Sequence, residues 1–305
     1  MSGRMGLAPD RGAAAAAAAV AQAEAAFQAL RRQRRLATLL GAGIFLACLL
    51  TAGWVSEFHP ATLWAGLPRI GEYFSRIAPS LEWGKLFAGV ETEGSLAFWM
   101  YRLDAWGLLL FETAQMAALA TLMGAVVGLL LAFPAARNLG LPGWMSEAAR
   151  RLLEATRTVP EIVFALIFVW AFGVGALAGI LAIALHTAGA LGKLFADAME
   201  NIEMRPWEGV RASGGSWFQA CRYAVLPAAA PDLLSYAMLR FEINLRSASV
   251  IGFVGAGGIG EELYKVISFN YYEEISAIIV LVILAVVCVD LLSEKLRRRV
   301  IEAVS

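Results

Sequence analysis

The sequence has few charged residues and few of the residue types that build catalytic or metal sites. Only 16% of its 305 residues are charged and 59% are hydrophobic, whereas a soluble domain carries about a quarter charged residues. Two histidines are too few for a histidine-rich metal site, and the three cysteines lie far apart without metal-ligand spacing. These shortages exclude an ordinary soluble domain and indicate an integral membrane protein without a metal site.

Enzyme signatures are also missing. The sequence contains no G-x-x-x-x-G-K-[ST] phosphate loop, so we do not expect the chain to hydrolyse ATP itself. No paired carboxylates, H-E-x-x-H or serine–histidine pattern supports a membrane enzyme, although Glu112, His186 and Glu242 lie in apolar segments. Lysine plus arginine and aspartate plus glutamate both total 25, so net charge does not identify a partner. We expect a non-enzymatic chain that binds no cofactor and no nucleic acid.

Long apolar runs predict the membrane spans. Residues 36–56 contain no charge and are long enough to cross a hydrocarbon core of about 30 Å. Further spans are predicted at 106–133 and 275–292, and one begins near Leu233, after two prolines suited to a helix start. The run 162–192 holds 31 residues without Asp, Glu, Lys or Arg, which is long for one helix and short for two.

The distribution of lysine and arginine resolves this ambiguity. If the run breaks at "GVGALAG" into two helices, 18 basic residues lie in the cytoplasm and 5 outside. If it is a single helix, the totals become 11 and 12, without the cytoplasmic excess that membrane proteins show. The charge pattern therefore predicts an all-α membrane protein of six transmembrane helices with both termini in the cytoplasm.

Two segments flank this predicted core. Residues 1–35 are rich in alanine and form a cytoplasmic segment with high helix propensity, either a helix against a partner or the membrane surface or a loosely ordered extension. An external stretch, about 57–105, mixes aromatics, prolines and charges, which favours short interfacial helices over a separate domain. The transmembrane domain then extends over 36–301.

A polar segment at about 193–227 falls on the cytoplasmic side. Its paired glycines predict a turn between two short helices, and such a unit can dock into a groove of a soluble partner. Within this segment Glu208, Arg211, Gly214, Gly215, Leu226 and Pro227 are the residues to which the resemblance described next gives a role in coupling to a partner.

The spacing in this loop resembles that of ABC importer permeases. That family carries Glu-Ala-Ala, three residues, Gly, nine residues, Ile, one residue and Leu-Pro, and Glu208, Gly214, Leu226 and Pro227 occupy the corresponding positions. The alanine pair and the isoleucine are replaced here by Gly-Val and Ala. The stretches "HTAGALGKLFADA" and "RFEINLRSASVIGFVGAGGIG" are similar to the phosphonate-importer permease branch, and the resemblance covers about 105–301.

This resemblance implies a fold, partners and a substrate. It implies the type I ABC importer permease fold in a bacterial cytoplasmic (inner) membrane, with a second copy of the chain completing the translocation path through the lipid bilayer. It also implies two cytoplasmic ATPase subunits that bind ATP and Mg, and an external solute-binding protein. The implied substrate is a phosphonate, with phosphite or another small phosphorus oxyanion as the alternative. A stand-alone secondary transporter is a further alternative, but it would not need the Glu208–Pro227 loop.

Charged residues inside the predicted fifth span need a special explanation. Arg240, Glu242 and Arg246 lie at hydrocarbon depth, where each charge costs on the order of 3 kcal/mol. Glu242 and Arg246 are four residues apart, so they can pair on one helix face. Two interpretations stay open: the charges lock neighbouring helices together, or an arginine lines the path with Ser247 or Ser249 and binds an oxyanion through its guanidinium fork.

Two interpretations also apply to the fourth span, where His186 and Thr187 either form interhelical hydrogen bonds or take part in substrate contact or proton handling. Glu161 follows a proline at the start of the third span, where an acid favours a helix N-terminus.

The glycine run "GAGGIG" at 255–260 matches the dinucleotide fingerprint only by letters. That motif needs a preceding strand, a following helix and an acid about twenty residues later, whereas a membrane helix precedes this run and position 280 is valine. We instead predict a close-packed, flexible turn at the outer end of the fifth span. We expect this turn to belong to the outer gate or to lie under the binding protein, with Gly255, Gly257, Gly258 and Gly260 as its key residues.

Overall fold

A computed structural model describes residues 11–302 of the chain, and the described part contains helices and no strand. The chain forms two compact units, Met1–Glu72 and Tyr73–Ser305, which are described separately below. The first ten residues of the predicted N-terminal segment lie outside the described residues.

The first unit consists mainly of one long helix, α1 (Arg11–Val55), followed by the start of α2 (Pro60–Ile77). The alanine-rich segment and the first predicted span form one continuous helix, as expected where alanines meet an uninterrupted apolar run. Its section Glu24–Val55 is long and apolar enough to cross a membrane.

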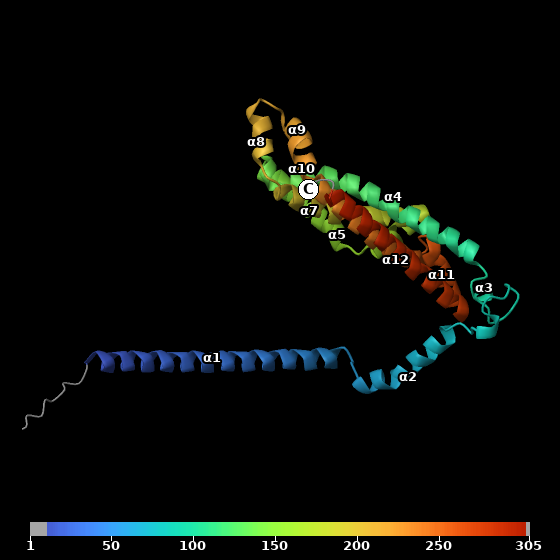
Figure 1. Ribbon diagram of the computed structural model, residues 1–305, viewed down its shortest axis with the longest axis horizontal. Helices are drawn as coiled ribbons and strands as arrows, with labels where there is room; N and C mark the ends of the chain where they lie inside the picture. The colour runs from blue at the N-terminus through green and yellow to red at the C-terminus, as the bar shows by residue number, and fades with distance from the viewer. Residues whose placement is uncertain (1–10, 303–305) are drawn as a thin grey trace, which may run out of the picture. The chain divides into compact units, whose positions relative to one another are not determined.

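The second unit is a packet of long helices (Figure 1). Its main elements are α3 (Leu96–Trp99), α4 (Leu103–Ala135), α5 (Gly143–Thr158), α6 (Glu161–Phe172), α7 (Ala176–Glu200), α8 (Arg205–Ala212), α9 (Trp217–Ala220), α10 (Leu226–Ile251), α11 (Gly258–Ser268) and α12 (Tyr272–Glu302). Within this unit α8 and α9 lie at one end and α3 lies at the other, and the C-terminal end of α12 lies at the α8–α9 end (Figure 1).

Four helices in the described residues are spans by length and apolar composition, namely α4, α7, α12 and the Glu24–Val55 section of α1. The other two predicted spans correspond to α6 and α10. The predicted break in the 31-residue run occurs at Gly173–Gly175, between α6 and α7. With 12 residues, α6 covers only about 18 Å at 1.5 Å per residue, so it cannot cross a bilayer by itself. Helix α10 is long enough, with 26 residues, but carries the charges discussed below.

Small residues allow α4 and α7 to pack closely. Gly124 and Gly128, four residues apart on α4, face α7: a Cβ on Gly124 would lie 2.6 Å from Thr187 Cγ2, and one on Gly128 would lie 2.9 Å from the Gly192 nitrogen. Because lipid tails are as apolar as leucine, helices in membranes associate through such close contact rather than through hydrophobic burial. This interface therefore fixes the depth of α4 relative to α7.

A valine at Gly128 is expected to destabilise the chain, because the backbone of α7 cannot move away like a side chain. We expect a loss of about 1–3 kcal/mol, typical of overpacking, measured by thermal unfolding of the purified chain in detergent. Gly107→Val on the same helix is the matched control, since a Cβ at Gly107 meets nothing within 4 Å. Equal stability losses in the two variants would contradict this assignment of the interface.

A buried arginine in the middle of α5 holds the ends of α4 and α7. Arg150 on α5 donates from Nε to the Ala135 carbonyl oxygen at 2.8 Å and pairs with Glu200 at the end of α7. Glu200 also accepts from the Arg137 backbone nitrogen at 2.7 Å. Helix α7 thus continues to Glu200, so the first eight residues of the predicted 193–227 loop belong to the helix.

The start of the fifth span also differs from the prediction. Helix α10 begins at Leu226 rather than near Leu233, and Pro231 lies inside it. A short π-helix, Cys221–Val225, precedes it, and the Leu226 nitrogen bonds to the Cys221 carbonyl oxygen five residues back. The wider turn accommodates Pro227, which has no N–H to continue the usual ladder. Two prolines therefore do not delay the helix here.

Candidate functional site

A buried polar cluster joins α4, α7 and α10 near the middle of each helix. Asn244 of α10 is fully buried, and its Nδ2 lies 2.8 Å from Thr121 Oγ1 and 3.0 Å from Thr187 Oγ1. Arg240, one turn earlier on α10, donates from Nε to Thr187 Oγ1 at 3.3 Å. Each hydrogen bond crosses a helix interface, as buried polar side chains in a membrane require.

A break in the helical backbone meets this cluster. Helix α5 ends at Thr158 and α6 begins at Glu161, because Pro160 has no N–H and holds the preceding residue in an extended conformation. His186 Nδ1 lies 3.1 Å from the Val159 carbonyl oxygen, so the ring satisfies a backbone group freed by the break. Non-helical backbone at membrane depth is tolerated only where it is buried in protein or lines a cavity.

The Arg240 guanidinium is only partly engaged. Its NH2 nitrogen lies 3.9 Å from Glu161 Oε2, which is ion-pair distance but beyond a hydrogen bond. Glu161 Oε2 is buried and has no hydrogen-bond partner among the described residues. Since Nε binds Thr187, the terminal N–H groups of Arg240 retain donors for another ligand. The Arg240 and Glu161 side chains are 13% and 24% exposed, so neither is completely enclosed by the chain.

The Glu242–Arg246 pair that the spacing allows is not formed. Arg246 instead lies 3.9 Å from Asp290 on α12, and this pair is substantially exposed, at 57% and 41% of the side chains. Glu242 is buried. The partner of Arg246 therefore comes from a neighbouring helix rather than from its own.

The predicted path residues therefore fall into two groups. Arg240, Thr187 and His186 lie around the helix break, whereas Arg246 lies at the exposed α10–α12 pair. Ser249 donates to the Leu245 carbonyl oxygen of its own helix at 3.2 Å, and Ser247 is partly buried. Only the first group brings several helices together around one guanidinium.

The glycine turn is packed inside the second unit. Gly255, Gly257 and Gly258 have φ of 82°, 81° and 70°, which side-chain-bearing residues rarely adopt. The Gly255 carbonyl oxygen accepts from the Gly175 nitrogen at 2.9 Å, which ties the turn to the start of α7. A Cβ on Gly260 would collide with the Ser249 carbonyl. The turn is close-packed as predicted but held by these contacts rather than loose, and its role in an outer gate stays a prediction.

The predicted coupling segment forms a helical hairpin at one end of the second unit. Glu208 and Arg211 lie exposed on α8, and Gly214 has φ of 85° in the turn that follows. Arg211 NH1 donates to the Gly215 carbonyl oxygen at 3.0 Å, and a capping box at Ser216 starts α9. Trp217 Nε1 donates to the Leu139 carbonyl oxygen at 2.8 Å, which fixes α9 to the segment after α4.

The sequence analysis did not identify Asn244 and Thr121, and it assigned Glu161 only to a helix N-terminus. Asn244 lies four residues after Arg240 in an apolar helix, a spacing that places both on one face and could have indicated it. Thr121 gave no comparable signal because single threonines are common in apolar helices. In the described residues no group of three His, Cys, Asp or Glu side chains is placed to hold a metal ion.

Comparison with known proteins identifies the family. Residues 97–302 match the family model described as "Binding-protein-dependent transport system inner membrane component". The chain is 37% identical to the phosphite transport system permease protein PtxC of Stutzerimonas stutzeri over 84% of this chain and 86% of that protein. It is 34% identical to the phosphate-import permease protein PhnE of Mycolicibacterium smegmatis over 82% of this chain but only 43% of that longer protein.

Solved structures support the fold. An inward-facing MetNI methionine ABC transporter superposes with a TM-score of 0.58 at 20% identity, covering 66% of this chain and 98% of that one. A bacterial alginate ABC importer gives 0.54 at 16% identity, covering 83% and 98%. The predicted all-α permease fold and the resemblance to phosphonate-type permeases are thus confirmed. The chain belongs to the family of binding-protein-dependent transport system inner membrane components, as a permease subunit of an ABC importer and not an enzyme.

Proposed function

We propose that this chain is the translocating subunit of an ATP-driven importer for phosphorus oxyanions of the phosphonate and phosphite type. The observation that carries the proposal is Arg240, a partly engaged guanidinium at mid-helix depth beside a backbone break. A guanidinium presents a rigid fork of donors that matches a phosphorus oxyanion. The names of the relatives support the same substrate class, since they include phosphite and phosphate permeases.

Glu161 gives the site a means of release. Its carboxylate lies near Arg240 and partly neutralises it, so an entering oxyanion competes with a group that is already present. Conduction needs binding that is favourable enough for entry and weak enough for exit. Asn244 and Thr187 hold the Arg240 side chain through the hydrogen bond at Nε, which orients its terminal N–H groups.

The path itself is completed by a second copy of the chain. Leu239, Ile243, Arg246 and Val250 follow one another at spacings of four, three and four along α10, so they share one face, and all four are exposed in the isolated chain. An exposed Arg246–Asp290 pair facing lipid is costly. A second α10, or water between the two copies, removes that cost.

The chain is coupled to ATPase subunits through α8. Glu208 lies in the first turn of an exposed, amphipathic helix, and the hydrogen bond from Trp217 transmits movement of the hairpin to the end of α4. We propose that ATP and Mg bind only to those subunits, that an external binding protein delivers the substrate, and that the complex lies in the bacterial inner membrane.

Uptake under phosphorus limitation tests the substrate class. Cells without this chain, and cells expressing it, receive labelled methylphosphonate, 2-aminoethylphosphonate, phosphite or phosphate. We expect uptake of a phosphonate or phosphite to depend on the chain. If only phosphate uptake depended on the chain, the substrate class would move to phosphate. If no phosphorus compound did, the substrate proposal would fail.

A further inference from the structure

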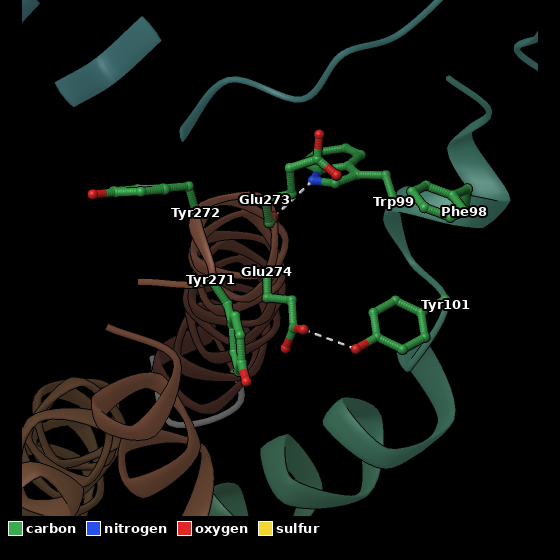
Figure 2. A pocket seen from close by; sticks show the side chains of 7 residues that line it. All are labelled: Phe98, Trp99, Tyr101, Tyr271, Tyr272, Glu273 and Glu274. Atoms are coloured by element: carbon green, nitrogen blue, oxygen red, sulfur yellow. Dashed lines mark hydrogen bonds between the residues drawn. The ribbon is translucent and has the colours of Figure 1, made fainter. Parts of the chain in front are cut away.

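A pair of adjoining cavities lies at the α3 end of the second unit, away from Arg240. The first, of about 450 Å³, is lined by five aromatic residues and two carboxylates: Phe98, Trp99, Tyr101, Tyr271, Tyr272, Glu273 and Glu274 (Figure 2). The second, of about 400 Å³, shares Tyr101, Tyr271 and Glu274 with the first and adds Arg102, Glu262 and Lys265 among its lining residues. Neither cavity belongs to the proposed path.

The aromatic walls of the first cavity are held by hydrogen bonds. Trp99 Nε1 lies 3.1 Å from the Glu273 carbonyl oxygen and 3.0 Å from Ser276 Oγ, which fixes the indole against the start of α12. The Tyr101 hydroxyl donates to Glu274 Oε1 at 2.8 Å, and Figure 2 shows the Glu274 carboxylate between the side chains of Tyr101 and Tyr271. Such a preformed cavity loses little conformational freedom when a ligand binds.

The two carboxylates of the first cavity favour a cationic ligand. Glu273 and Glu274 lie in the first turn of α12, where the helix dipole stabilises their ionised form. Burial and the neighbouring Glu274 raise the pKa of Tyr101, so its proton remains available to that carboxylate at neutral pH. One oxygen of each carboxylate accepts a hydrogen bond, Glu273 from Ser80 and Glu274 from Tyr101, so the other oxygen can contact a ligand. Aromatic faces and carboxylates together are the chemistry that recognises an ammonium group.

The second cavity adds two cations, Arg102 and Lys265, to a lining that also contains the carboxylates of Glu262 and Glu274. Arg102 pairs with Glu262 at 2.8 Å and Lys265 with Glu261 at 2.9 Å, yet the Arg102 and Lys265 side chains remain 42% and 53% exposed. The hydrogen bond to Glu261 raises the pKa of Lys265, with the charges of Glu261 and Glu262 acting in the same direction, so Lys265 is a cation throughout the physiological range. Both cations can therefore add a contact to an anion.

We infer that the two cavities together bind a zwitterion in which an ammonium group lies a few bonds from a phosphorus oxyanion. The ammonium occupies the aromatic cavity beside Glu273 and Glu274, and the oxyanion faces Lys265 and Arg102. Two sources carry this chemistry: a free aminoalkylphosphonate and the headgroup of phosphatidylethanolamine. The site is separate from Arg240, so its binding can be measured on the chain alone, without transport.

Titration of the purified chain tests the free zwitterion. The chain is placed in nanodiscs of phosphatidylglycerol and titrated calorimetrically with 2-aminoethylphosphonate, methylphosphonate and ethanolamine. We expect 2-aminoethylphosphonate to bind at least about tenfold more tightly than either single-charge probe, because each probe lacks one of the two charged contacts. Glu274→Gln removes this preference, and the matched control Glu91→Gln, at an exposed acid outside both cavities, keeps it.

The lipid source has its own measurement. The chain is extracted from membranes rich in phosphatidylethanolamine, and the retained lipid is counted by native mass spectrometry for wild type, Glu274→Gln and Glu91→Gln. Retention that is lost only in Glu274→Gln, without binding of free 2-aminoethylphosphonate, assigns the site to the headgroup. Absence of both free binding and selective retention overturns the inference. Methylphosphonate uptake by Glu274→Gln stays at wild-type level, so failure here is distinguishable from failure of the proposed transport function.

Discussion

Replacing Arg240 with glutamine is expected to lower substrate uptake by at least about tenfold. Hydrogen bonds to a charged group contribute about 1.5–3 kcal/mol each, and about 1.4 kcal/mol corresponds to a factor of ten. The terminal N–H groups of Arg240 are the donors with no hydrogen-bond partner in the described cluster, so their loss removes the proposed contact to the oxyanion. The measurement is ATP-driven uptake by the assembled transporter in proteoliposomes, with assembly checked by gel filtration.

A double variant separates this role from simple charge pairing. Arg240→Gln alone leaves Glu161 without its nearest cation, which can impair folding or assembly on its own. Glu161→Gln combined with Arg240→Gln removes both charges, so a purely structural pair predicts recovered uptake. We expect uptake to stay low in the double variant and Glu161→Gln alone to transport. Recovery in the double variant would show that Arg240 serves only to neutralise Glu161.

Glu208→Lys is expected to reduce ATP-driven uptake to below about a tenth of wild type while the chain remains folded. Glu208 is exposed on α8, so the substitution should not disturb packing within the chain, and surface charge changes usually alter stability by no more than about 0.5 kcal/mol. Reversing the charge at a docking surface instead places like charges together at the interface. Uptake and co-purification of the ATPase subunit are measured on the same preparations.

Glu203→Lys is the matched control for the coupling hairpin. Glu203 lies shortly before α8 and makes an exposed ion pair with Arg205 at 3.1 Å, the kind of contact whose loss costs about 0–1 kcal/mol. We expect this variant to retain most of its uptake and its ATPase subunit. Equal losses in both variants would indicate a general sensitivity of the loop to charge, and normal uptake in Glu208→Lys would contradict coupling through α8.

The helical fold could be predicted because membrane-spanning segments have a distinctly apolar composition. Long apolar runs indicated α4, α7 and α12, and the basic-residue count required the break between α6 and α7 that the structure contains. Boundaries were less accurate. Helix α10 begins seven residues before the predicted start because a π-turn accommodates Pro227. No local sequence signal distinguishes an early start through a π-turn from a later start after the prolines.

Only part of the candidate site could be predicted from the sequence. Arg240 and Thr187 were identified because charge and polarity are conspicuous in an apolar helix. Their arrangement was not predictable, because it depends on which helices become neighbours. The pairing of Arg246 illustrates this: the sequence offered Glu242 one turn away, and the fold supplied Asp290 from α12.

The sequence by itself determined that this protein is a multi-helix membrane permease, because hydropathy, basic-residue placement and loop spacing are properties of consecutive residues. The tertiary structure alone decided that Asn244 and Thr121 support Arg240, that Glu161 faces it, and that aromatic rings from α3 and α12 enclose a cavity with two carboxylates. Each of these contacts joins residues far apart in the chain, so it depends on how the helices pack against one another, as α4 and α7 do at Gly124 and Gly128.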